Sequence, residues 1–308
     1  MIQIERILCP IDFSDCSRHA LDHAVAMARW YGSAITLLHV YSVVPVAAYE
    51  PGTPMPPSVA LTPADREALL ASMKRFAEEE AGSDRPIQCE TCEGTAAIEI
   101  LDRAKTMPSD LIVMGTHGRT GFERLMLGSV TEKVLRKAAC PVLSVPRLVR
   151  DAVPAPPVLF KDILCAIDFS DCSIHALKYA MSLAQEAAAR LTVVHVIELL
   201  PELSPGTDEA VQAWPRHVAE YLAEVEHDRR ERLRAAVPES VRAYCAVENV
   251  LANGTPHRAI VRVAAEQHSD LIVIGIHGRG ATDLLFFGST AQHVVRQATC
   301  PVLTLRRG

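Results

Sequence analysis

The chain has 308 residues, which corresponds to about two domains at roughly 150 residues each. Apolar residues make up 49% and charged residues 22%, which is typical of soluble globular proteins and too apolar for a disordered chain. The net charge is −6, so the chain lacks the basic surface that nucleic-acid binding usually needs. The start of the chain lacks a signal-peptide pattern, no apolar run is long enough to span a bilayer, and the nine cysteines do not suggest a disulfide scaffold. We therefore expect a cytoplasmic protein that contacts neither nucleic acid nor membrane.

The sequence contains an internal repeat. Residues 7–40 align with 163–196 at an offset of 156, with 18 of 34 positions identical, and ILCPIDFSDCSRHAL matches ILCAIDFSDCSIHAL most strongly. Further along, at an offset of 160, SDLIVMGTHGR matches SDLIVIGIHGR and ACPVLSV matches TCPVLTL. Because each copy is domain-sized, we expect domains at 1–147 and 159–308, joined by a proline-rich linker at 148–158.

Hydrophobic patterns predict alternating strands and helices in each copy. In chain order, the first copy is predicted to contain a buried strand at 7–11, a helix from Ser14 or Asp15 to Gly32, a strand at 34–40, a long loop at 42–60, a helix at 64–81, a strand at 87–92, a helix at 95–105, a strand at 111–114, a helix at 129–139 and a strand at 142–145. Continuous apolar strands that alternate with helices indicate a parallel sheet covered on both faces. We predict two tandem, doubly wound, Rossmann-like α/β domains, each with a five-stranded parallel sheet in the order 3-2-1-4-5.

The last strand of each copy is expected to form a sheet edge. The segments Val142–Val145 and Val302–Leu305 are mostly apolar, and apolar edges tend to be paired. We therefore expect these two strands to pair antiparallel across the two halves, so that the chain mimics a dimer of single domains. The sequence leaves open whether whole chains pair further into a homodimer.

Glycines are concentrated in two short segments. Residues 115–129 and 275–289 hold eight of the fifteen glycines, and each segment contains G-x2-G-x9-G-S between a predicted strand and a predicted helix. Glycines there let the backbone approach a ligand closely, and a helix N-terminus favours phosphate. Neither GxxxxGK[ST] nor GxGxxG is present. A phosphate site is favoured, and a loop that only ends a strand and begins a helix is the alternative.

Three motifs in order carry a family resemblance. A first strand ending in IDFS, the G-x2-G-x9-G-[ST] segment and a final CPVL strand resemble the universal stress protein family, and the set occurs twice. The chain is thus similar, over almost its whole length, to a tandem universal stress protein. The resemblance implies a stress-response protein that binds ATP, ADP or AMP, with Mg²⁺ held through the phosphates if it is bound at all.

The resemblance also implies which residues contact the nucleotide. The end of the first strand would lie by the adenosine, the backbone at the end of the second strand would read the adenine edge, and the glycine segment would hold the ribose and phosphates. In the first copy these positions are Pro10, Ile11, Asp12, Val40, Met114, Gly115, His117, Gly118, Arg119, Gly128, Ser129 and Val130. In the second copy they are Ala166, Ile167, Asp168, Val196, Ile274, Gly275, His277, Gly278, Arg279, Gly288, Ser289 and Thr290.

The two copies differ between the last two glycines of the motif. The first offers Arg119 and Arg124 to phosphates, whereas the second keeps Arg279 but has Leu284 in place of the second arginine. If one site binds more weakly, we expect it to be the second.

Several histidines and cysteines have structural interpretations beside functional ones. His117 and His277 could contact phosphate or act as a base, but packing under the loop is at least as favoured. His39 and His195 are expected to be structural. The CxxC pair at 89 and 92 lies on a predicted strand, where residues three apart face opposite ways, so we predict no metal site there.

The sequence also contains a charged stretch, and it offers no clear catalytic group. The stretch EVEHDRRERLR at 224–234 is interpreted as a solvated helix face. A helix-dipole role for Asp12 is the alternative to ribose binding. No catalytic residue emerges, so we predict a nucleotide-dependent regulator. The alternatives are a nucleotide-independent scaffold or interaction protein and a slow nucleotide hydrolase using Asp12 or His117.

Overall fold

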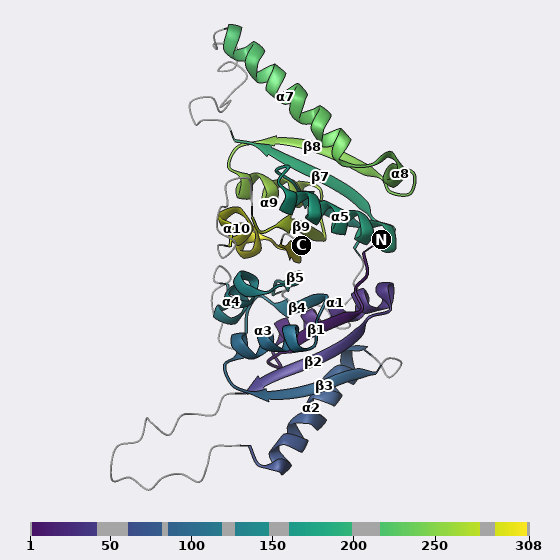
Figure 1. Ribbon diagram of the computed structural model, residues 1–308, viewed down its shortest axis with the longest axis vertical. Coiled ribbons are helices and arrows are strands. Elements are labelled where there is room, and N and C mark those ends of the chain that lie inside the picture. Colours follow the sequence, from purple (N-terminus) through teal and green to yellow (C-terminus); the bar gives the residue numbers. More distant parts are fainter. Residues whose placement is uncertain are drawn as a thin grey trace, which may run out of the picture. The chain divides into compact units, whose positions relative to one another are not determined.

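The computed structural model divides into two compact units, Gln3–Val158 and Leu159–Gly308 with Met1–Ile2 (Figure 1). The structure describes residues 2–41, 61–81, 86–118, 127–147, 160–198, 216–277 and 287–306. The loop predicted at 42–60 and the linker predicted at 148–158 lie outside these ranges. No helix within the described ranges is long and apolar enough to cross a membrane.

The first unit is a parallel α/β sheet with helices on both faces. Its elements in chain order are β1 (Arg6–Ile11), α1 (Asp15–Tyr31), β2 (Ala34–Tyr41), α2 (Pro63–Ala81), β3 (Ile87–Glu93), α3 (Ala96–Thr106), β4 (Leu111–Gly115), α4 (Ser129–Lys137) and β5 (Val142–Val145). The strand order is β3-β2-β1-β4-β5, and every neighbouring pair is parallel. This order confirms the prediction of a doubly wound sheet.

The second unit repeats this topology. Its elements are β6 (Asp162–Ala166), α5 (Asp171–Glu186), β7 (Arg190–Ile197), α7 (Arg216–Ala236), α8 (Glu239–Arg242), β8 (Val247–Asn253), α9 (Pro256–Glu266), β9 (Leu271–Gly275), α10 (Ser289–Gln297) and β10 (Val302–Leu305). The order β8-β7-β6-β9-β10 again corresponds to 3-2-1-4-5, with parallel pairs throughout.

Helices cover both faces of the first sheet. Helices α1 and α2 pack together on one face, and α3 and α4 pack together on the other (Figure 1). The central strands are therefore buried on both sides, and Leu111, Ile112 and Val113 of β4 are inaccessible to solvent. Continuous apolar strands are the sequence signature of this burial.

Helix α1 begins and ends where the sequence predicts. Ser14 caps its N-terminus by accepting a hydrogen bond from the Ser17 N–H at 3.2 Å. Gly32 ends it in the left-handed conformation, with φ of 71°. In α5 the cap is Ser170, but the left-handed position after the helix is taken by Ala188, with φ of 50°.

Helix α4 is shorter than the prediction of 129–139. It ends at Lys137 because Ala138 adopts an extended backbone with φ of −61° and ψ of 136°. The extended residue starts the turn that leads through Pro141 into β5.

Candidate functional site

A cavity of about 660 Å³ lies at the carboxyl ends of β6, β7 and β9 in the second unit. Ligands of doubly wound sheets bind beyond this edge of the strands, and the volume falls within the usual range of roughly 300–1,000 Å³ for small-molecule sites. The strands contribute their last residues to the lining, the α10 N-terminus contributes polar groups, and α7 and α9 contribute mostly apolar side chains. The position and volume of the cavity therefore suit a small molecule.

Ten of the twelve positions predicted for the second copy line this cavity. They are Ala166, Ile167, Asp168, Val196, Ile274, Gly275, His277, Gly288, Ser289 and Thr290. The other two, Gly278 and Arg279, lie outside the described residues. Four separate segments of the sequence thus meet at one place, although their contact with a nucleotide stays a prediction.

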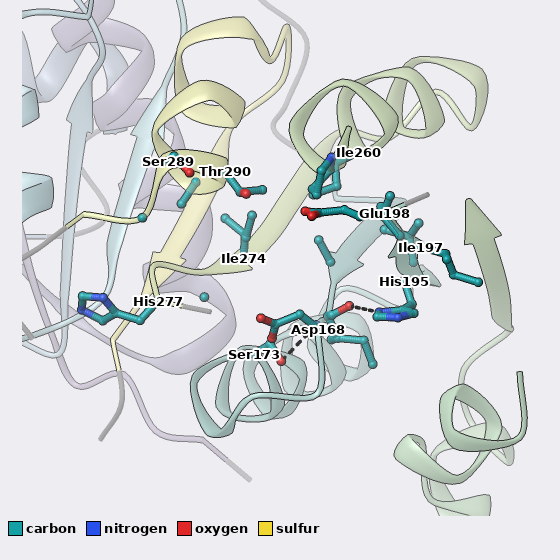
Figure 2. Close-up of a pocket in the computed structure, with 18 of the residues that line it drawn as sticks. Asp168, Ser173, His195, Ile197, Glu198, Ile260, Ile274, His277, Ser289 and Thr290 are labelled. Carbon is teal, nitrogen blue, oxygen red and sulfur yellow. Dashed lines mark hydrogen bonds between the residues drawn. The ribbon is translucent and has the colours of Figure 1, made fainter. Parts of the chain in front are cut away.

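Asp168 is held at the cavity edge by the turn that follows β6. The Ser170 N–H and Oγ donate hydrogen bonds to its Oδ1 at 3.0 and 2.6 Å, respectively. The Asp168 N–H donates to Ser173 Oγ at 3.2 Å, and Ser173 also lines the cavity. Figure 2 shows Asp168 and Ser173 on one side of the cavity, with Ile274 between them and the pair Ser289 and Thr290.

The turn itself is strained and is supported by a histidine. Phe169 adopts a left-handed backbone with φ of 64°, which is uncommon for an aromatic residue. Its ring packs against His195 with centroids 4.6 Å apart and the ring planes tilted by 48°. His195 Nδ1 donates to the Ile167 carbonyl at 2.8 Å (Figure 2). His195 therefore ties β7 to the end of β6, as expected of a structural histidine, although it also lines the cavity.

The opposite side of the cavity is formed by the start of α10. The Gly288 N–H donates to the Ile276 carbonyl at 2.8 Å, and a Cβ atom on Gly288 would lie only 2.5 Å from that oxygen. Only glycine permits this contact. The exposed Ser289 and half-buried Thr290 follow in the first turn of the helix. Free N–H groups and the positive end of the helix dipole make this turn suitable for an anion.

His277 is buried, with 8% of its surface exposed, and its ring points away from Asp168 in Figure 2. In the first unit, His117 Nδ1 and Thr116 Oγ1 are hydrogen-bonded at 2.9 Å. His277 also lines the cavity, so contact with a ligand and packing both stay open as interpretations of these residues.

The first unit repeats the aspartate geometry. Asp12 Oδ1 accepts hydrogen bonds from the Ser14 N–H and Oγ at 3.1 and 2.5 Å, and Ser17 Oγ donates to the same atom. A Cβ atom on Gly118 would lie 2.7 Å from Asp12 Oδ2. The second motif glycine therefore passes directly beside the aspartate, and a larger residue there would displace the Asp12 carboxylate.

The other predicted residues of the first copy lie at the corresponding positions. Most end a strand or begin α4: Pro10 and Ile11 in β1, Val40 in β2, Met114 and Gly115 in β4, Gly128 before α4, and Ser129 and Val130 in its first turn. Arg119 lies outside the described residues, as do Arg124 and Leu284, on which the expected difference between the two sites depends.

The interpretation of 224–234 as a solvated helix face is wrong for part of that stretch. Val225 and Arg229 of α7 line the cavity, and Leu233 is buried with 1% exposure. These residues are four apart and lie along one side of the helix. The arginine interrupts the apolar pattern, so the buried stripe was not recognised from the sequence.

Other lining residues were also missed by the sequence analysis. They are Ser173, Val194, His195, Ile197, Glu198, Pro256, Ile260, Ile276 and Ala291. Ser173 had a usable signal, because it lies in the IDFSDCS stretch that is identical in both copies. The α9 residues and Glu198 carry no comparable motif. Figure 2 shows Glu198 pointing into the cavity.

The cysteine thiols that the structure describes form no disulfide, and their neighbours are protein atoms. Cys92 Sγ donates to Glu99 Oε2 at 3.1 Å, whereas Cys89 Sγ lies 3.9 Å from the Ile87 carbonyl, and neither forms a disulfide. Burial raises the pKa of the Cys300 thiol to about 12 and that of Cys140 to about 11. Within the described ranges, no three His, Cys, Asp or Glu side chains are grouped so as to hold a metal ion.

Comparisons with known proteins agree with these motifs. The sequence model of the Universal stress protein family matches residues 3–146 and 159–306. Universal stress protein MJ0531 of Methanocaldococcus jannaschii is 36% identical over 141 residues, covering 46% of this chain and 81% of that protein. Universal stress protein Rv2005c of Mycobacterium tuberculosis is 29% identical over 286 residues, covering 89% of this chain and 87% of that protein.

The fold is also found among solved structures. The crystal structure of a universal stress protein from Archaeoglobus fulgidus superimposes with a TM-score of 0.64 at 24% identity, covering 99% of this chain and 97% of that one. At this identity the likeness concerns the fold alone, whereas the family model matches most of the sequence and does so twice. The chain therefore belongs to the universal stress protein family and contains two of its domains in tandem.

Proposed function

We propose that this chain binds ATP or a related adenine nucleotide, ADP or AMP, and acts as a nucleotide-dependent regulator in the stress response. The sites are the cavity of the second unit and the matching strand ends of the first. The observation that carries the proposal is the cavity of about 660 Å³ that has Asp168 on one side and the α10 N-terminus on the other.

Each part of a nucleotide has a chemically suitable surface in this cavity. The first turn of α10 suits the phosphates, because its N–H groups and Ser289 hydroxyl can donate hydrogen bonds. The Asp168 carboxylate suits ribose hydroxyls, because it can accept their hydrogen bonds. The apolar side chains of Ile197, Val225 and Ile260 suit the faces of a base.

We propose regulation rather than efficient turnover. Asp168 and Asp12 accept hydrogen bonds from the serines of their own turns, which suits positioning more than proton transfer. Any Mg²⁺ would be held chiefly through the phosphates. The nine free thiols suit the reducing cytoplasm, where we place the protein. A slow nucleotide hydrolase and a nucleotide-independent scaffold are the alternatives.

A pair of substitutions at Ser289 tests phosphate binding without removing the helix cap. Ser289→Asp places a negative charge in the first turn of α10, where it favours the helix by about 0.3–1 kcal/mol but repels phosphate. Ser289→Asn is the matched control, because asparagine has nearly the same shape as aspartate but no charge. We expect Ser289→Asp to weaken ATP binding at the second site at least tenfold in calorimetry, while the melting temperature of the ligand-free protein is kept.

Ser129→Asp is the equivalent substitution in the first unit, and it assigns each binding event to a site. The double variant should bind ATP at least tenfold more weakly at both sites. Equal ATP affinity in Ser289→Asp and Ser289→Asn would show that the α10 N-terminus does not hold phosphate, and the proposed site would be wrong.

A further inference from the structure

Arg229 is an unexpected charged residue in the wall of the second-unit cavity. It projects from α7 between Val225, which also lines the cavity, and the buried Leu233. Only 24% of its side chain is exposed, whereas the side chain of the next residue, Arg230, is 66% exposed. Two adjacent arginines on one helix thus have opposite environments.

The Arg229 guanidinium contains a buried donor that makes no hydrogen bond within the described residues. Its Nη1 atom is buried and has no hydrogen-bond partner among the described residues. The carboxylate of Asp228 lies 3.4 Å from this atom as an ion pair, and the Asp228 side chain is itself 59% exposed. A buried N–H group without an acceptor is unfavourable, so a ligand that brings an acceptor to this wall would gain from the contact.

The position of Arg229 decides which part of a nucleotide it can reach. Helix α7 packs on β7 and β8, whereas α10 packs on α9 and begins at the side of the cavity with Ser289 and Thr290. If the phosphates lie at the α10 N-terminus, the nucleoside extends over the ends of β6 and β7 toward α7. Arg229 then faces the nucleoside and not the phosphates.

We propose that Arg229 is a specificity-determining residue of the second site, whose guanidinium donates a hydrogen bond to a neutral acceptor on the nucleoside, either a ring nitrogen or a ribose oxygen. This inference rests on the proposed nucleotide binding. The first unit has a different wall, because α2 presents the buried Met73 and Phe76, and Phe76 packs edge-to-face on Phe13 at 5.6 Å. The two sites therefore differ in how they recognise the nucleoside.

The test uses the full chain with Ser129→Asp, which weakens ATP and AMP at the first site. Adenosine, which has no phosphate, is titrated as binding to two sites, and only the event that differs between Arg229→Met and its parent is assigned to the second site. Affinities for ATP, AMP and adenosine are measured by calorimetry in this parent, in Arg229→Met and in Arg230→Met. Methionine keeps an apolar stem of similar length but removes every donor. We expect Arg229→Met to weaken all three ligands by a similar factor of about ten or more, because each contains the same nucleoside. Arg230→Met should bind all three as the parent does.

A second readout separates recognition from a structural role. Because Nη1 is buried and makes no hydrogen bond with any residue that the structure describes, the ligand-free Arg229→Met protein should be at least as resistant to urea as its parent. A structural arginine would instead leave the variant less stable in the absence of ligand, and that result would overturn the inference.

The remaining outcomes are also decisive. Weaker binding of ATP with unchanged binding of adenosine would place Arg229 on the phosphates and overturn the inference. Unchanged binding of all three ligands by Arg229→Met would overturn it too, while the nucleotide-binding proposal would stand. If the parent binds none of the three, the second site fails as a nucleotide site and the inference fails with it.

Discussion

At the scale of single residues, the two site aspartates depend on the unusual turns that hold them. Phe13 and Phe169 both adopt left-handed backbone conformations, with φ of 62° and 64°. Such a conformation costs about 1–2 kcal/mol for a residue with a Cβ atom. The tilted ring contacts of Phe13 with His39 and of Phe169 with His195, with centroids 4.9 and 4.6 Å apart, help to offset this strain. The strain lies next to Asp12 and Asp168, which is where a ligand site would use a fixed carboxylate.

His23 makes the first unit sensitive to acid. Burial lowers the pKa of His23 from 6.5 to about 4, because its charged form would be poorly solvated inside the unit. Between these two pH values the unfolded chain binds a proton that the folded chain does not. Above pH 6.5 the histidine is neutral in both states and does not affect the free energy of unfolding. As the pH falls from 6.5 toward 4, that free energy decreases by roughly 3 kcal/mol in total.

The variant His23→Tyr tests this dependence, because Tyr179 occupies the matching position of the second copy. The slope of the free energy of unfolding against pH gives the number of protons taken up on unfolding. We expect this number, measured by urea unfolding between pH 7 and 4.5, to be smaller by up to one in the variant. The slope is compared rather than the stability itself, since tyrosine also changes the packing. Equal slopes in both proteins would show that His23 does not titrate abnormally.

At the scale of elements, the two copies end the same helix in different ways. Gly32 and Ala188 both occupy the left-handed position after the helix, but only alanine has a Cβ atom that disfavours it. A Cβ atom added to Gly32 would meet no atom within 4 Å, so the expected effect of substitution is conformational rather than steric.

Reciprocal substitutions should therefore have opposite effects. Gly32→Ala is expected to lower the free energy of unfolding by about 1 kcal/mol, and Ala188→Gly to raise it by up to about the same amount. Urea unfolding of the two variants beside the wild type measures both changes. A destabilising effect of Ala188→Gly would contradict this account of the helix ends.

The same scale shows what the sequence could predict. Most element bounds follow from the continuous apolar runs and from the caps at Ser14 and Gly32, because local chemistry decides them. The strand order was expected from the fold class and not from these local patterns. The lining contributed by α7 and α9 could not be predicted, because it depends on which side of each helix meets the strand ends. Arg229 shows this best, since a charged residue in a charged stretch is interpreted as solvated until the tertiary packing is known. The close approach of Gly118 to Asp12 is likewise a contact between distant segments.

At the scale of the whole molecule, we propose that β5 and β10 pair antiparallel, because both are apolar edge strands of their own units. Hydrogen exchange on the full chain tests this pairing. The amides of β5 that do not point toward β4 should exchange slowly, as should the corresponding amides of β10. Rapid exchange of these amides would contradict the pairing.

The affinities of the two units for ATP can also be compared within one chain. Ser129→Asp weakens the first site and leaves the second unchanged, and Ser289→Asp does the reverse. From the sequence differences between 119–126 and 279–286, we expect the first site to bind ATP more tightly. Tighter binding by the Ser129→Asp protein would reverse this order without affecting the proposal that both units bind.

Calorimetric titration of the full chain with ATP tests the central claim most directly. The account predicts saturable binding in the wild type, weaker binding at one site in each of Ser129→Asp and Ser289→Asp, and weaker binding at both sites in the double variant. Absence of saturable binding by a wild-type protein that also releases no adenine nucleotide on heat denaturation would contradict it.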